Sequence, residues 1–354
     1  MKLLSNNSAG STVMKIVVPL IITIGLCYIL FTGIDFSQMI TIIKRDCDFI
    51  WIGLALVISV FSHIFRAMRW RIQLDAIDCR TPLKYLVYSV FGTYAINLVF
   101  PRLGELWRAG YIAQRQERPF VAVFGSMVAE RLADTFTVLL LTLLTFLLAS
   151  SAIVAFVAKY PEVYTGIMNM LSSPWLYIAV SAVALLLIWF FRRKTGNRYM
   201  IKTKEALREL WKGFSAIATM PGKGKWLLLT FAIWGCYFTQ LYVAFYSFPF
   251  TTELLQTDGI IVCLVCFVLS SIAMGIPSNG GIGPWQIAVI FGLSIYMPSF
   301  YNATEAAEFK MNSAAFANLV LGAQTLLLII LGLYTFAAIA LDRRRKSAGS
   351  EARR

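Results

Sequence analysis

The sequence contains few charged residues and almost no histidine. Aspartate, glutamate, lysine and arginine make up 14% of its 354 residues, and there is one histidine. A soluble domain usually carries about 25% charged residues, while 58% of this chain is hydrophobic. These values exclude a water-soluble globular protein and predict an all-α polytopic membrane protein.

The chain also lacks the residue patterns of a disulfide scaffold, a metal site or a hydrolase. Cys263 and Cys266 form a C-x-x-C pair, but they lie inside an apolar run with no second pair nearby. One histidine leaves too few ligands for zinc. There is no HExxH sequence, no serine nucleophile motif and no nucleotide-binding loop. We therefore expect buried cysteines, no metal and no cofactor.

Basic residues outnumber acidic ones by 32 to 18, which gives a net charge of +14. In a soluble protein this excess would suggest nucleic acid. Here the cations lie between long apolar runs, where they orient a chain in the bilayer and contact anionic headgroups. We expect membrane lipids as partners and no nucleic acid.

Eight apolar stretches are separated by polar connectors. Because a helix needs about 20 apolar residues to cross a bilayer, six of the stretches are predicted to be full spans. The other two are interrupted by proline and glycine and are predicted to be re-entrant helical hairpins, although parity alone would allow two full spans in either place. The spans lie near residues 16–33, 50–66, 120–158, 175–191, 226–247 and 313–341, and the hairpins at 83–116 and 259–297.

The distribution of lysine and arginine predicts the orientation of the chain. Of these residues, 27 fall in connectors on one side of the predicted membrane and 4 in connectors on the other. Since positive charge accumulates in cytoplasmic loops, both termini are expected to be cytoplasmic, in a cell (inner) membrane. The first hairpin then enters from the cytoplasmic side and the second from the opposite side.

The two halves repeat one order of elements with opposite orientation. Each half runs span, span, broken hairpin, span, and Pro101 and Pro277 each begin a Pro-x-x-Gly sequence, 176 residues apart. Paired interruptions in an inverted repeat point to a transporter's binding site; ordinary surface turns are the alternative. The predicted parts are a cytoplasmic N-terminus (1–15), a first repeat (16–158), an inverted second repeat (175–341) and a basic cytoplasmic tail (342–354).

The two breaks expose backbone groups and helix N-termini. Half-helices beginning after each break would offer free N–H groups that suit an anion such as phosphate. Glycines in the second break would let a headgroup approach the backbone closely. Hairpin tips meeting near the middle of the bilayer would form one site. The residues expected there are Asn97, Pro101, Arg102, Gly104, Glu105, Pro277, Asn279, Gly280, Gly281 and Gly283.

Three charged residues lie at membrane depth in the stretch that starts near Pro119. Glu130 and Asp134 are four residues apart and share a helix face, with Arg131 beside them. They lie about 16–22 Å from the cytoplasmic end of the helix, where an ionised side chain is a functional candidate. An ion-pair cluster with a purely architectural role is the alternative. The expected partners are Arg102 and Arg108, with Glu105 beside them.

Arg66 and Arg69, together with Arg71, close the second predicted span at its cytoplasmic end. Either they set the topology, with side chains that reach back to the interface, or they capture an anionic headgroup from the inner leaflet.

Four blocks of residues resemble a known family. They are RAMRWRIQL (66–74), NLVFPRLGELWRAGYIA (97–113), ERLADT (130–135) and GIPSNGGIGPWQ (275–286). In this order they resemble the lysylphosphatidylglycerol synthase transmembrane region, also called the flippase-like domain family, over about residues 15–341.

This resemblance implies translocation of lipids or lipid-linked precursors between leaflets. In the bacterial synthases the domain flips an aminoacylated phospholipid that a soluble C-terminal domain makes. Since the chain stops at Arg354, we expect that synthase domain to be absent and the cargo to be another anionic lipid. By resemblance, Arg102, Gly104, Glu105, the Glu130–Arg131–Asp134 set and the turn at 280–283 would line the path.

The leading hypothesis is therefore a non-enzymatic translocator of an anionic phospholipid or lipid-linked precursor. Protonation of Glu105, Glu130 or Asp134 would extend it to a proton-coupled carrier. Two alternatives stay open: a membrane-embedded enzyme acting on a lipid-linked substrate, and a non-transporting partner of a separate lipid synthase. Nothing in the sequence indicates the oligomeric state.

Overall fold

The computed structural model describes residues 36–100, 102–150, 220–298 and 300–351, with isolated positions between 154 and 208. Pro101, the span predicted at 16–33 and most of the span predicted at 175–191 lie outside the described residues. Within the described ranges every regular element is an α-helix. The helices are α2 (Phe36–Asp46), α3 (Phe49–Asp75), α4 (Leu83–Val99), α5 (Leu103–Arg115), α6 (Phe120–Leu148), α11 (Lys223–Phe245), α12 (Pro249–Asp258), α13 (Ile260–Ala273), α14 (Pro284–Ile295) and α15 (Ala303–Glu351).

Four of these helices are long and apolar enough to cross a membrane: α3, α6, α11 and α15. The pair α12 and α13, bent by 111° at the break between them, gives a fifth if it is counted as one span. The multi-pass helical membrane protein predicted from the sequence is thus confirmed. The total of six spans and the inverted repeat stay predictions.

Two short helices occupy segments that were expected to be connectors. α2 lies within the connector at 34–48 and α12 covers the one at 248–258. Pro249 begins α12, a position where the missing N–H of proline costs nothing, and Thr251 Oγ1 donates to Phe245 O at 2.6 Å. A criterion based on spans of about 20 residues misses helices of 10 and 11 residues with polar faces.

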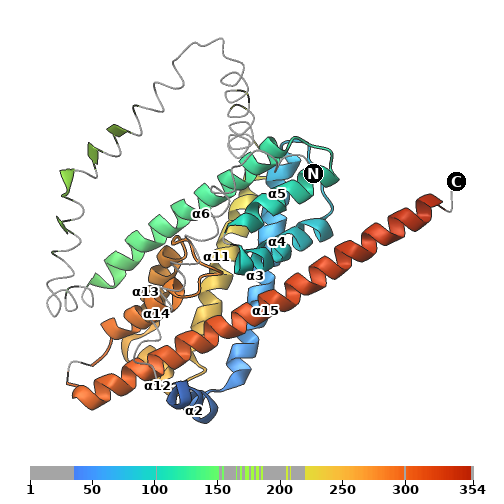
Figure 1. Cartoon of the computed structure of the whole chain (residues 1–354). Helices are drawn as coiled ribbons and strands as arrows, with labels where there is room; N and C mark the ends of the chain where they lie inside the picture. Colours follow the sequence, from blue (N-terminus) through green and yellow to red (C-terminus); the bar gives the residue numbers. More distant parts are fainter. Residues whose placement is uncertain are drawn as a thin grey trace.

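The buried hydrophobic side chains form two cores. One includes Trp70, Ile112 and Met127, from α3, α5 and α6. The other includes Phe245 and Phe316 and draws on α11 to α15. α3 packs along α11 in the centre, while α15 crosses the body and contacts α4 and α14 (Figure 1).

The two interrupted stretches form helix pairs broken where proline and glycine predict. α4 has 17 residues and α5 has 13, and the chain turns between them at Arg102, which adopts a left-handed conformation with φ 62°. α13 and α14 flank the second break, and α14 begins at Pro284 after Gly283, as expected. In Figure 1 the α4–α5 and α13–α14 pairs lie toward opposite ends of the bundle.

An amide side chain holds each break in a similar way. Asn97 Oδ1 accepts from Gly104 N at 2.9 Å, and Gln286 Oε1 accepts from Gly283 N at 2.7 Å. Both bonds satisfy a backbone donor at the start of the following helix, where no intrahelical acceptor exists. In both breaks, therefore, a side-chain amide oxygen accepts a hydrogen bond from the backbone at the start of the following helix.

Candidate functional site

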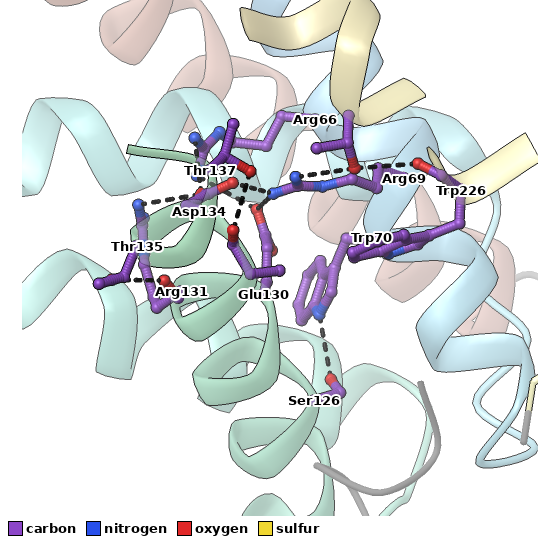
Figure 2. Close-up of polar contacts among 12 residues, drawn as sticks. Arg66, Arg69, Trp70, Ser126, Glu130, Arg131, Asp134, Thr135, Thr137 and Trp226 are labelled. Carbon is purple, nitrogen blue, oxygen red and sulfur yellow. Dashed lines mark hydrogen bonds and ion pairs between the residues drawn. The ribbon is translucent and has the colours of Figure 1, made fainter. Parts of the chain in front are cut away.

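The acidic face of α6 packs against two arginines of α3. Glu130 Oε1 lies 3.1 Å from Arg66 Nη1 and 3.3 Å from Arg69 Nη2. Asp134 Oδ1 lies 2.8 Å from Arg69 Nη2, and its Oδ2 lies 3.2 Å from Arg66 Nη2. Each helix presents two like charges about one turn apart, so each carboxylate pairs with both arginines (Figure 2).

A third arginine reaches the same carboxylate from α5. Arg108 Nη1 lies 3.3 Å from Glu130 Oε2, and its guanidinium carbon lies 4.0 Å from the centroid of the Trp70 ring. Trp70 Nε1 in turn donates to Ser126 Oγ at 3.0 Å. Within the described part of the chain, Arg108 Nε and Nη2 have no hydrogen-bond partner although both are buried.

A fourth arginine closes the edge of the site. Arg131 Nε lies 2.9 Å from Glu105 Oε1, and Arg131 Nη1 lies 4.0 Å from Asp134 Oδ2. The side chains of Arg131 and Glu105 are 36% and 28% exposed, whereas the Glu130 side chain is fully buried. The site thus reaches the surface at the Arg131–Glu105 pair. We call the whole set the arginine cluster: Arg66, Arg69, Arg108, Arg131, Glu105, Glu130 and Asp134.

α11 covers the cluster on a further side. Arg66 Nε donates to Tyr237 Oη at 3.3 Å, Arg69 Nη1 donates to Thr230 Oγ1 at 3.3 Å, and the guanidinium carbon of Arg69 lies 5.6 Å from the Trp226 ring. Charges so enclosed interact in a low dielectric, where a missing partner costs more than it would in water.

The structure places Arg66 and Arg69 differently from both sequence interpretations. Arg66 and Arg69 are 4% and 0% exposed and are buried against α6. The helix α3 continues past them to Asp75. They are neither interfacial side chains reaching for headgroups nor an open capture site. Their i,i+3 spacing, matched to the i,i+4 acids of α6, is the signal that could have indicated this pairing.

The expected pairing of Arg102 with the acids is wrong among the described residues. Arg102 Nη2 instead donates to Gly275 O at 2.7 Å, because its left-handed backbone at the start of α5 directs the chain toward the second break. Arg108 and Glu105 do join the acids as expected.

The tips of the two broken pairs contact each other. Besides the Arg102 bond, Asn279 Nδ2 donates to Leu98 O at 3.1 Å and to Val99 O at 3.4 Å. Gly280, with φ +63°, packs against the Leu98 side chain so closely that a Cβ there would clash. The sequence predicted that these tips would meet, and Glu105 links them to the arginine cluster through the first turn of α5.

The remaining site residues predicted from the sequence lie around the tips. Gly281 and Gly283 are buried within the second break and have positive φ, while Pro277 is exposed. Gly104 packs beneath α4, where Thr93 O and Asn97 Oδ1 leave no space for a Cβ. Among the described residues, no group of three or more histidine, cysteine, aspartate or glutamate side chains could hold a metal ion.

Comparison with known proteins covers most of the membrane part of the chain. The sequence model of the family described as lysylphosphatidylglycerol synthase TM region matches residues 16–322. The glycosyltransferase AglD of Haloferax volcanii is 32% identical over 124 residues, which are 35% of this chain and 20% of that protein. The match thus spans one fifth of the length of that relative, and no solved structure matches the chain. The family match, over most of the chain, shows that the chain belongs to the lysylphosphatidylglycerol synthase transmembrane-region family.

Proposed function

We propose that this protein moves lipids with anionic headgroups between the two leaflets of the membrane. The observation that carries the proposal is Arg108, a buried guanidinium with two unpartnered donors. It lies in a cluster with more arginines than carboxylates, next to the contacting tips of two broken helix pairs. A phosphate-bearing headgroup supplies acceptors for these two donors.

The state of the carboxylates favours transport over chemistry on the lipid. Glu105, Glu130 and Asp134 each lie within an ion pair to an arginine, at 2.9, 3.1 and 2.8 Å. A general acid or base must exchange a proton near the working pH, and carboxylates neutralised by guanidinium groups are poor candidates. The same pairing argues against the proton-coupled version of the hypothesis.

A lipid transferase is the competing function, because the relative in Haloferax volcanii is named a glycosyltransferase. The matched segment covers a fifth of that protein. If this chain were a transferase, purified protein would convert a lipid-linked acceptor into a new product when given an activated sugar.

The proposal is tested in proteoliposomes with phosphatidylglycerol that carries a fluorescent acyl chain, and with dithionite added outside to quench accessible label. We expect the protected fraction to fall below that of empty vesicles. Arg108→Gln should lose this activity, while Arg71→Gln should keep it, because the Arg71 side chain is 50% exposed and lies outside the cluster.

Protected fractions equal to those of empty vesicles would overturn the proposal, provided that the protein elutes as one species in detergent. Chemical conversion of the labelled lipid, read by thin-layer chromatography, would favour the transferase.

A further inference from the structure

We infer that the arginine cluster selects a headgroup with one net negative charge, a phosphodiester without further charged groups. Dianionic, zwitterionic and cationic headgroups are rejected. This inference rests on the proposed function and names the substrate class of the same site.

The charge of the cluster sets this selectivity. It contains four arginines and three carboxylates. Arginine stays protonated in proteins, and each carboxylate forms an ion pair with a guanidinium nitrogen at 3.1 Å or less. The closed cluster therefore holds one uncompensated positive charge.

The uncompensated charge is best placed on Arg108. Glu130, its one ion-pair partner among the described residues, is shared with Arg66 and Arg69. The two donors without partners, Nε and Nη2, form one edge of the guanidinium plane. This edge is the fork that binds two oxygens of a phosphate or carboxylate group side-on. Glu130 lies at Nη1, at the other edge, so these two donors are left for one further anion.

Because the arginine cluster is buried, its net charge discriminates between headgroups of different charge. The Arg108 side chain is 1% exposed, so neither water nor salt screens a residual charge there. A monoanion brings the cluster to zero. A zwitterion leaves one positive charge, an aminoacylated cationic lipid leaves two, and a dianionic phosphomonoester leaves one negative charge.

A headgroup would enter at the Arg131–Glu105 pair, where the cluster reaches the surface. Glu105 lies in the first turn of α5, directly after the tip that Arg102 binds to Gly275. Separation of the tips would move Glu105 and uncover the fork of Arg108. The acyl chains stay outside, because the apolar side chains of α6 that face away from the cluster are exposed, Leu132 and Phe136 among them.

The test compares lipids that share one fluorescent acyl chain and differ in headgroup charge. At pH 8 the set is phosphatidylglycerol (−1), phosphatidylcholine (zero), lysyl-phosphatidylglycerol (net positive, with its α-amino group about half protonated) and phosphatidic acid (between −1 and −2). We expect wild-type protein to move phosphatidylglycerol faster than each of the others by about tenfold or more, the ratio that 1.4 kcal/mol corresponds to.

Two variants shift the charge of the cluster in opposite directions. Arg108→Gln makes the cluster neutral, so movement of phosphatidylglycerol should fall to the level of phosphatidylcholine or below it. Glu105→Gln raises the charge to two and should shift the preference toward phosphatidic acid. Arg71→Gln removes an exposed charge from the same helix as Arg66 and should leave the order of lipids unchanged.

The outcomes separate this inference from the function on which it rests. If wild-type protein moves all four lipids at similar rates, charge selection is wrong and translocation stands. If it moves none, the proposed function falls and the inference with it. Should both variants fail to elute as folded protein, the order of the four lipids with wild type decides, and any order not led by phosphatidylglycerol overturns the inference.

Discussion

Arg69 carries a charge at a position with no solvent contact, and two carboxylates and a threonine hydroxyl surround it. Its Nη2 is shared between Glu130 and Asp134, and its Nη1 donates to Thr230. Taking such a group out of water is costly and is offset only while its partners are present. The stability of the α3–α6 contact thus depends on a complete cluster.

Removing Arg69 should destabilise the protein strongly. Arg69→Ala leaves two carboxylates short of a partner, and breaking a buried pair in this way costs about 3–5 kcal/mol. Arg71→Ala changes the same residue type two positions away, at a half-exposed site, and should cost less than about 0.5 kcal/mol. Thermal unfolding in detergent, followed by loss of the monodisperse peak, would measure both. Similar losses for the two variants would contradict the buried-pair account.

Single residues show where sequence reasoning succeeds and where it stops. Glu130 and Asp134 stand out because charges inside an apolar helix are rare, and their shared face follows from spacing. The unpartnered fork of Arg108 could not be predicted, because it depends on arginines of two helices, α3 and α5, sharing Glu130 of α6. The partner of Arg102 was missed because one left-handed residue redirects the chain.

The α4–α5 pair is held together by close backbone contact at Gly104. A Cβ at this position would lie 2.7 Å from Asn97 Oδ1 and still closer to the carbonyl oxygen of Thr93. Because Thr93 O belongs to the backbone, it cannot move aside without distorting α4. Gly104 therefore fixes how near the two half-helices lie.

Gly104→Ala should loosen this pair, and we expect a lower melting temperature and new protease cleavage near residues 99–104. Gly53→Ala is the matched control, because a Cβ on Gly53 meets nothing within 4 Å. This control should be neutral or stabilise α3, since alanine favours helix by up to about 1 kcal/mol over glycine. Equal behaviour of the two variants would show that the close contact at Gly104 is unimportant.

The contact between the two tips depends on few hydrogen bonds. Asn279→Asp keeps the size of the side chain but removes the Nδ2 donor to Leu98 O and Val99 O. Hydrogen–deuterium exchange at 96–104 and 274–283 should then become faster. Asn302→Asp is the control, because Asn302 serves as an acceptor for Thr304 N and Glu305 N, a role aspartate retains. Unchanged exchange in Asn279→Asp would mean that these bonds do not hold the tips.

At the scale of helices, the positions of proline and glycine predicted both breaks and the start of α14. The sequence did not predict α2 or α12, since neither reaches the length of a span and both carry polar residues on one face. It also ended the second span at residue 66, because arginines there were assigned to the interface. Their burial by α6 and α11 is a tertiary effect that spacing along α3 alone does not encode.

At the scale of the whole molecule, basic side chains of the described residues lie where α3 ends and α11 begins, Arg71 and Lys225 among them. The end of α3 and the start of α11 together line a cavity of about 310 Å³ with Arg71, Asp75 and Lys225. These two helix ends therefore lie on one side, as the alternation of spans requires. The positive-inside rule predicts that this side is cytoplasmic.

Labelling of cells with a membrane-impermeant maleimide tests this orientation. Gln256→Cys, in α12 at the opposite end of α11, should react in intact cells. Lys225→Cys should react only after the membrane is permeabilised. Wild-type protein, whose described cysteines are buried or half-buried, gives the background. The reverse pattern would invert the predicted topology and the sides from which the two broken pairs enter.

The long helix α15 connects the two broken helix pairs mechanically. α15 has 49 residues, or about 74 Å at 1.5 Å per residue, and it touches α4 from one broken pair and α14 from the other. At Gly332 it lies so near Ala95 of α4 that not even a methyl group fits between them, and Gln286 of α14 is hydrogen-bonded to Asn318 of the same rod at 2.7 Å. Because α4 and α14 both pack against α15, a displacement of either helix would tilt α15 and so be transmitted to the other.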